Sequence, residues 1–137
     1  MRRNLVLILI LCLGSCSSSS RQAVVLQRQS YETPLERTQY STINMQGWTV
    51  LVAPGYADVP VIFFHVLALL DDHLYRINRV IPSPALEQLK AVEIWLEVDM
   101  HKNAAMGYHP SEDWLSANGY NTDKAGAVEV SNAQAFL

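Results

Sequence analysis

The side chains best suited to acid–base or metal chemistry in this sequence are four histidines, His65, His73, His101 and His109. Histidine acts as a proton carrier or as a metal ligand near neutral pH. A zinc site on one helix needs two histidines about one turn apart, whereas His65 and His73 are separated by about two turns. His101 and His109 flank a loop that could fold back. We interpret the four as structural residues with hydrogen-bond partners, and we expect no metal and no cofactor.

A second pattern is a pair of carboxylates beside an aromatic ring, Glu93 and Glu97 on either side of Trp95. Such a pair can bind sugars or perform acid–base chemistry. The same residues fit the solvated face of a strand, and we favour that interpretation. Ser111 precedes two acids, as a helix cap does. The sequence has no Gly-x-Ser-x-Gly turn and no glycine-rich phosphate loop, so no catalytic residue is assigned.

Cys16 has the clearest chemical assignment. Met1-Arg2-Arg3 is followed by an apolar run, Leu5 to Leu13, and then by Gly14-Ser15-Cys16. A charged start, a short apolar core and small residues are typical of a secretory signal. The run is shorter than the roughly 20 residues that span a membrane. A cysteine directly after the small residues resembles a bacterial lipoprotein signal, in which the thiol receives a lipid and the chain is cut before Cys16.

This signal predicts lipidation of Cys16 and attachment to the membrane of the cell envelope. Each buried acyl methylene contributes about 0.8 kcal/mol, and stable anchoring takes more than one chain. Ser17, in place of aspartate, resembles lipoproteins that are sorted to the outer membrane, which predicts a protein facing the periplasm. The alternative is an ordinary secretory signal in which Cys16 is incidental.

The composition limits the classes of partner. The chain has a net charge of −3, and loss of Arg2 and Arg3 with the signal takes the 10 basic residues to 8, against 13 acidic ones. There is no basic stripe, so we expect no nucleic-acid partner. A hydrophobic content of 50% favours a folded domain. With Cys12 removed and Cys16 acylated, no thiol remains for a disulfide. No protein partner can be named.

Three regions are predicted along the chain: a lipoprotein signal peptide (1–15), a flexible polar tether (16–42) and a single domain (43–137). Polar residues dominate the tether, which would let the domain stand away from the membrane. Its one apolar spot, residues 24–26, has an edge strand as the alternative interpretation. The apolar pair Phe136-Leu137 either docks on the core or precedes a missing piece of the sequence.

The domain is predicted to be α/β (α+β), with a small sheet of about three strands packed on one long helix. The first strand, 48–52, is rich in β-branched and aromatic residues and precedes the turn signal Pro54-Gly55. The second, 92–98, alternates apolar and polar side chains. The third is 127–130, and residues 100–108 are predicted to be a loop.

The long helix is predicted over Val59–Ile81. Apolar residues three and four apart gather on one of its faces: Phe63, Leu67, Leu70, Leu74, Ile77 and Ile81. The first half, 61–70, is apolar almost all round, so we expect it to be buried. Three shorter helices are also predicted. One covers residues 85–90, a second follows a cap at Ser111, and a third begins at Ala133 after a cap at Asn132.

Several blocks of the domain carry a family resemblance: Gly47-Trp48-Thr49-Val50, Ile94-Trp95-Leu96-Glu97, Tyr108-His109-Pro110-Ser111, Trp114-Leu115 and residues 125–133. Together they resemble uncharacterised secreted bacterial proteins related to zincin-like metallopeptidases. The resemblance covers most of the chain after Ile43, with Thr122 in place of an expected proline. In that family, Asn-Ala-x-x-Phe-Leu leads into a helix with a His-Glu-x-x-His motif, whose histidines hold zinc while the glutamate activates water.

The printed sequence contains no His-Glu-x-x-His motif, so no catalytic or metal residue is carried over. The resemblance implies a zincin-like front half without the zinc helix. We therefore predict a lipid-anchored envelope protein with a non-catalytic or truncated metallopeptidase-like domain. One alternative is the N-terminal part of an active zinc metallopeptidase whose catalytic helix is missing from this sequence. Another is a structural lipoprotein that binds envelope partners through the polar strand face around Trp95.

Overall fold

The computed structural model describes residues 34–98 and 105–137. The signal peptide, the lipidation site Cys16, most of the predicted tether and His101 lie outside the described residues. For these positions the assignments made from the sequence stay predictions.

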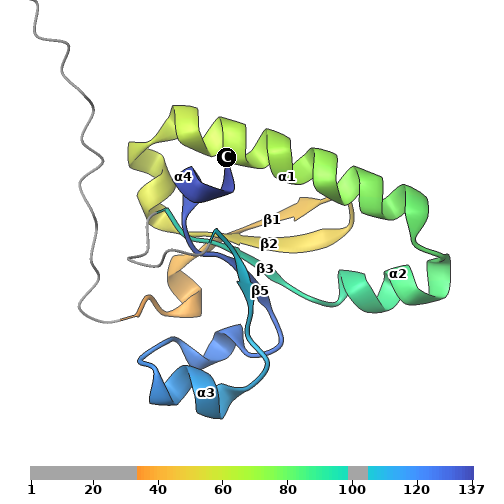
Figure 1. Ribbon diagram of the computed structural model, residues 1–137. Helices are drawn as coiled ribbons and strands as arrows, with labels where there is room; N and C mark the ends of the chain where they lie inside the picture. Colours follow the sequence, from red (N-terminus) through yellow and green to blue (C-terminus); the bar gives the residue numbers. More distant parts are fainter. Residues whose placement is uncertain (1–33, 99–104) are drawn as a thin grey trace, which may run out of the picture.

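The described residues form a mixed α/β domain on a five-stranded sheet with the order β1-β2-β3-β5-β4 (Figure 1). β1 (Ser41–Met45) pairs antiparallel with β2 (Trp48–Val52). The central strand β3 (Ile94–Leu96) runs parallel to β2 and to β5 (Val128–Val130). β4 (Gly107–Tyr108) pairs antiparallel with β5 at the far edge. The sheet therefore has five strands where about three were predicted, and the additional ones lie at its two edges.

The hairpin between β1 and β2 explains one of the additional strands. Gln46 and Gly47 both have positive φ, 54° and 94°, which is the backbone of a two-residue turn that matches the twist of a hairpin. A Cβ at Gly47 would also lie 3.0 Å from Lys90 Nζ. The sequence Gln-Gly is a weaker turn signal than Asn-Gly, and the first two residues of β1, 41 and 42, fall within the predicted tether.

The long helix α1 (Pro60–Val80) lies across one face of the sheet (Figure 1), which confirms the predicted helix to within one residue at each end. Leu70 and Leu74 on its predicted apolar face are buried against the sheet. The expectation that its first half is buried is wrong in part, because Val61 and Phe64 are each 68% exposed. Only one side of that apolar segment meets the sheet.

Two of the shorter helices follow the predicted caps, whereas the helix predicted at 85–90 begins earlier, after Pro82 and without a side-chain cap. α2 (Ser83–Lys90) has Pro84 in its first turn. The Ser111 side chain accepts a hydrogen bond from Trp114 N at the start of α3 (Glu112–Ala117), and Asn132 accepts one from Ala135 N at the start of α4 (Ala133–Phe136). Three 3-10 turns complete the described elements: η1 (Arg37–Gln39), η2 (Pro54–Asp58) and η3 (Thr122–Lys124). Among the described residues, no helix is both long enough and apolar enough to cross a membrane.

Both faces of the sheet are covered, by different parts of the chain. Alternate residues of a strand point to opposite faces; Ile94 and Val128 lie on the face that α1 covers, and Trp95 and Glu129 on the other. The second face is covered by the segment around η1, where Leu35 and Tyr40 are each 8% exposed. The folded domain thus includes residues that the sequence pattern places in the tether.

Candidate functional site

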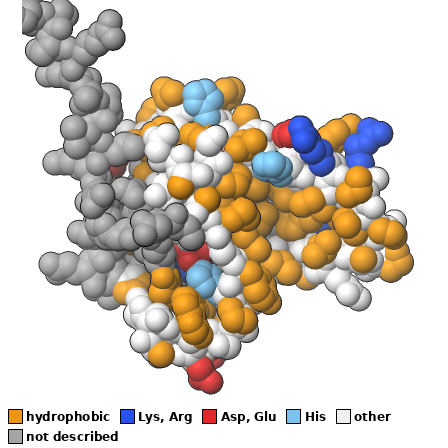
Figure 2. Space-filling view, viewed as in Figure 1, with side chains coloured by type: hydrophobic (Ala, Val, Ile, Leu, Met, Phe, Trp, Pro, Cys, Tyr) orange, Lys and Arg blue, Asp and Glu red, His pale blue; other side chains and the backbone are white. Residues whose placement is uncertain are grey.

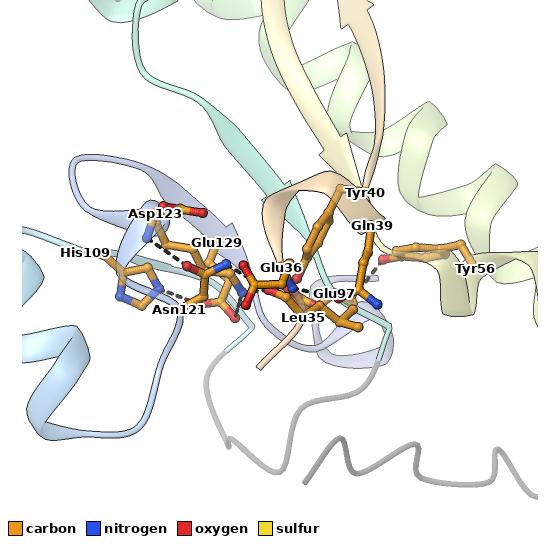
Figure 3. A network of polar contacts seen from close by, with 11 residues as sticks. Leu35, Glu36, Gln39, Tyr40, Tyr56, Glu97, His109, Asn121, Asp123 and Glu129 are labelled. Atoms are coloured by element: carbon orange, nitrogen blue, oxygen red, sulfur yellow. Dashed lines mark hydrogen bonds and ion pairs between the residues drawn. The ribbon is translucent and has the colours of Figure 1, made fainter. Parts of the chain in front are cut away.

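Behind the sheet, on the face opposite α1, five polar side chains meet in one buried cluster (Figure 3). They come from five separate segments, and we call them the buried ionic cluster: Tyr40, Glu97, His109, Lys124 and Glu129. Each of these residues is at most 8% exposed. The sheet brings the two glutamates together, because Glu129 lies in β5 and Glu97 directly follows β3.

Lys124 joins the two carboxylates of this cluster. Its Nζ donates to Glu97 Oε1 at 2.6 Å and to Glu129 Oε1 at 3.2 Å. The Tyr40 hydroxyl donates to the same Glu97 oxygen, and His109 Nε2 bonds the second oxygen of Glu129. Lys124 Nζ also lies 5.4 Å from the centroid of the Trp95 ring, close enough for a cation–π attraction.

A neighbouring tyrosine, Tyr56, is hydrogen-bonded to the backbone of the same cluster. The Tyr56 hydroxyl donates to the backbone oxygen of Glu97 at 3.1 Å. Burial raises the pKa of Tyr56, and the negative charge of Glu97 raises it further. Tyr56 therefore stays neutral and keeps donating its hydrogen bond.

The burial of the cluster determines what it can do. Carboxylates near one another can transfer protons, but Glu97 is 1% exposed, Glu129 0% and Lys124 4%. A substrate in solution has no contact with these atoms. Charges removed from water are costly unless they are paired, and here each is paired. The cluster fastens the η1 segment and η3 to the back of the sheet, which is a structural role.

The predicted solvated strand face around Trp95 is wrong. Trp95 is 0% exposed, and its ring lies 4.8 Å from the Tyr40 ring in an edge-to-face contact. The Arg37 guanidinium also lies over the Trp95 ring, 5.5 Å from its centroid. Arg37 donates two hydrogen bonds of 2.5 Å to the Glu93 carboxylate, and these lower the pKa of Glu93. The surface proposed for envelope partners around Trp95 is therefore occupied by the chain's own η1 segment.

The described histidines are not brought together. His65 and His73 are exposed on α1, and His109 is buried against Glu129. His73 contacts the Phe136 ring, with 6.3 Å between the ring centroids. In the described ranges, no group of three or more histidine, cysteine or acidic side chains is placed to hold a metal ion.

The accessible candidate is an apolar groove of about 780 Å³ on the α1 side of the sheet, visible as a hollow bordered by hydrophobic side chains in Figure 2. α1 and the sheet form its floor and walls, α4 contributes Phe136, and the polar residues His73 and Arg76 also line it. The apolar lining includes Trp48, Leu70, Leu74, Ile77, Ile94, Met106, Tyr108, Val128 and Val130. We call this surface the apolar groove.

The edge strand β4 borders the apolar groove. His109 N donates to Ala127 O at 3.0 Å, and Ser131 N donates to Ala105 O at 3.0 Å. In the β4 segment, the odd-numbered residues are therefore the ones whose backbone groups form hydrogen bonds with the β5 segment. By the alternation of an antiparallel pair, the backbone N–H and C=O of Tyr108 point away from β5. Tyr108 is 59% exposed. Within residues 34–98 and 105–137, no strand pairs with this outer side of β4, which lies beside an apolar surface.

Sequence reasoning missed Lys124, Glu129 and Tyr40. The available signal was Glu129 itself, a carboxylate in the middle of an otherwise apolar strand, because a buried carboxylate requires a cation or a donor. Comparisons with protein-family models, with curated proteins and with solved structures find no match.

Proposed function

We propose that this chain is a lipid-anchored protein of the bacterial cell envelope, held by acyl chains on Cys16 and facing the periplasm from the outer membrane. The support is the sequence Leu13-Gly14-Ser15-Cys16 after a short apolar run and two arginines. A polar stretch then precedes the folded domain, which suits a protein that stands off a membrane surface.

The test of anchoring is Cys16→Ser, followed by fractionation of cells into soluble and membrane material. The variant should leave the membrane pellet, whereas Cys12→Ser should stay there, because Cys12 is removed with the signal. Mass spectrometry of the mature N-terminus should find an acylated cysteine. Retention of Cys16→Ser in the pellet, or an unacylated N-terminus in the parent protein, would overturn the proposal.

We further propose that the domain is the front half of a zincin-like fold that binds an extended peptide without cleaving it. The observation that carries this proposal is the outer edge of β4, with which no described strand pairs, beside the apolar groove. A peptide that adds as a strand gains main-chain hydrogen bonds from the edge and specificity from pockets for alternate side chains. Tyr108 serves both purposes, since its side chain lines the groove and its backbone points outward.

The test uses two substitutions at one position. Tyr108→Pro removes the outward N–H but leaves the pairing with β5 intact, because proline is tolerated on the free side of an edge strand. Tyr108→Ala removes the side chain and keeps the N–H. With a fluorescent peptide of alternating valine and threonine, proline should weaken binding about threefold to tenfold more than alanine, the value of one hydrogen bond. Equal binding by the two variants would exclude strand addition.

A second candidate is the front half of an active zinc metallopeptidase whose catalytic helix is encoded in a longer reading frame. The apolar groove favours it, because Ile77 and Val128 are half-buried and line the groove together with Phe136 of α4. An amphipathic helix continuing from α4 would bury these side chains further. The downstream DNA distinguishes the candidates: an in-frame His-Glu-x-x-His supports the peptidase, and a stop codon without it supports the peptide-binding domain.

A further inference from the structure

The first half of α1 presents an apolar surface that the function proposed above does not use. Val61, Phe64 and Ala68 are exposed and lie three and four residues apart, so they share one face of the helix. We call these three residues the α1 outer patch. We propose that the α1 outer patch docks on the surface of the lipid bilayer and inserts Phe64 among the headgroups.

The charge pattern of α1 supports this orientation. From Pro60 to Leu70 the helix carries no Lys, Arg, Asp or Glu. The same face continues into a charged second half, where Asp72 and Arg76 form an exposed ion pair. Only the first half therefore suits a surface that removes side chains from water.

The small size of the patch argues against a second copy of the chain as its occupant. A stable dimer buries about 800 Å² per partner, more than three adjacent side chains supply. A contact with the membrane needs less area, because the anchor keeps the bilayer close. Residues 17–33 separate Cys16 from the first described residue, a reach of at most about 60 Å. This step rests on the proposed lipidation, since tethering supplies the effective concentration.

The surrounding charges indicate the class of lipid. Asp58 precedes the patch, and Asp71 and Asp72 follow it, with no lysine or arginine between them. The chain as a whole has a net charge of −3, so anionic headgroups repel it rather than attract it. The docking surface is therefore a bilayer of zwitterionic lipid, and phosphatidylcholine vesicles are the probe.

The direct test places tryptophan at Phe64 in the acylated protein reconstituted into phosphatidylcholine vesicles. The difference emission spectrum against the parent protein should shift to shorter wavelength and be quenched by brominated lipid. Tyr75→Trp is the matched control, because Tyr75 is 47% exposed on the charged half of the same helix; its emission should not change. No shift at position 64 would overturn the proposal, and so would a shift that needs only high protein concentration and no vesicles.

A second measurement separates the patch from the anchor. In the unacylated Cys16→Ser protein, at a lipid concentration high enough to replace the effective concentration of the tether, Phe64→Ser should lower partition into phosphatidylcholine vesicles about tenfold or more, from the lost burial of one aromatic side chain. Tyr75→Ser should leave partition unchanged, and added phosphatidylglycerol should reduce it. Partition that does not depend on Phe64 would overturn the proposed docking of the α1 outer patch, and the proposed lipidation of Cys16 would still stand. An unacylated N-terminus with Phe64-dependent partition would overturn only the anchor.

Discussion

Lys124 lies between two carboxylates that water does not reach, and its removal leaves both without their shared cation. Breaking a buried ion pair by deleting one partner costs about 3 to 5 kcal/mol. We expect Lys124→Met to lower the free energy of unfolding by that amount, measured by urea denaturation. Arg76→Met is the control, because its pair with Asp72 is exposed and is worth at most about 0.5 kcal/mol.

A double variant checks the cause of that loss. Adding Glu97→Gln to Lys124→Met removes the charge of a carboxylate that has lost its cation, so part of the lost stability should return. If Lys124→Met unfolds at the same urea concentration as the parent protein, the cluster does not hold the domain together.

The Arg37–Glu93 pair makes a prediction about pH. Hydrogen bonding from Arg37 lowers the pKa of Glu93 below its ordinary value of 4.5. A lowered pKa in the folded state means that the pair stabilises the fold above pH 4.5 and that this contribution is lost as the pH falls through the folded value. Arg37→Met should therefore be less stable than the parent protein at pH 7, with a difference that shrinks below pH 4.5.

The side chains are partly exposed, 43% for Arg37 and 28% for Glu93, so the effect at pH 7 is modest. Thermal unfolding of both proteins between pH 3 and pH 7 measures it. Glu93→Gln should remove the same pH-dependent part. A difference between Arg37→Met and the parent protein that is constant over this range would show that Arg37 acts only through packing on Trp95.

At the scale of residues, local roles were predictable and long-range ones were not. Ser111 and Asn132 could be recognised as caps because their partners lie three residues away. Glu97 was misread because its partners are distant in the chain, with Lys124 separated by 27 residues and Tyr40 by 57. The local sequence around a carboxylate is the same whether the side chain faces water or faces a tyrosine and a lysine from other segments.

Among the elements, α1 is the one whose packing carries the clearest energetic prediction. Leu74 is 4% exposed in the contact between α1 and the sheet. Truncation of a buried leucine costs about 2 to 5 kcal/mol, from lost burial and the cavity left behind. Leu74→Ala should lower the melting temperature clearly, whereas Val80→Ala, 73% exposed on the same helix, should change it little. Indistinguishable melting curves for Leu74→Ala and the parent protein would contradict the assignment of this face.

The elements predicted correctly are those with a strong internal pattern. β2 has a run of β-branched residues, and α1 has apolar residues at helical spacing over its whole length. β1 and β4 lack such patterns: β1 is mostly exposed or half-buried, and β4 has only two residues. Edge strands depend on their neighbours for pairing, and that information lies outside their own segments.

At the scale of the whole molecule, the purified mature chain is predicted to carry no stoichiometric zinc. Its described histidines come from separate places, two on the outside of α1 and one within the buried ionic cluster. Elemental analysis after purification without chelators measures the zinc content. One zinc ion per chain, retained after gel filtration, would contradict this prediction and favour the metallopeptidase candidate.

The mixed architecture was predictable from the sequence, but the use of both sheet faces was not. The hydrophobic pattern of 92–98 indicated a strand with one covered face. The second cover comes from the η1 segment, whose polar composition resembles that of the preceding tether. Leu35 and Tyr40 are isolated apolar residues there, and only the folded arrangement shows that they belong to the core.

The position of β3 has a consequence for the order of folding. The β1–β2 hairpin can close between neighbouring residues, but β3 needs β2 on one side and β5 on the other. Pairings between distant segments form slowly, because their loops must close first. A chain that emerges from a translocation pore with its N-terminus leading would form the hairpin early and complete the sheet only after Val130 has emerged. Until then Leu96 and its apolar neighbours remain open to aggregation, so the order in which the segments become available affects how much of the chain folds.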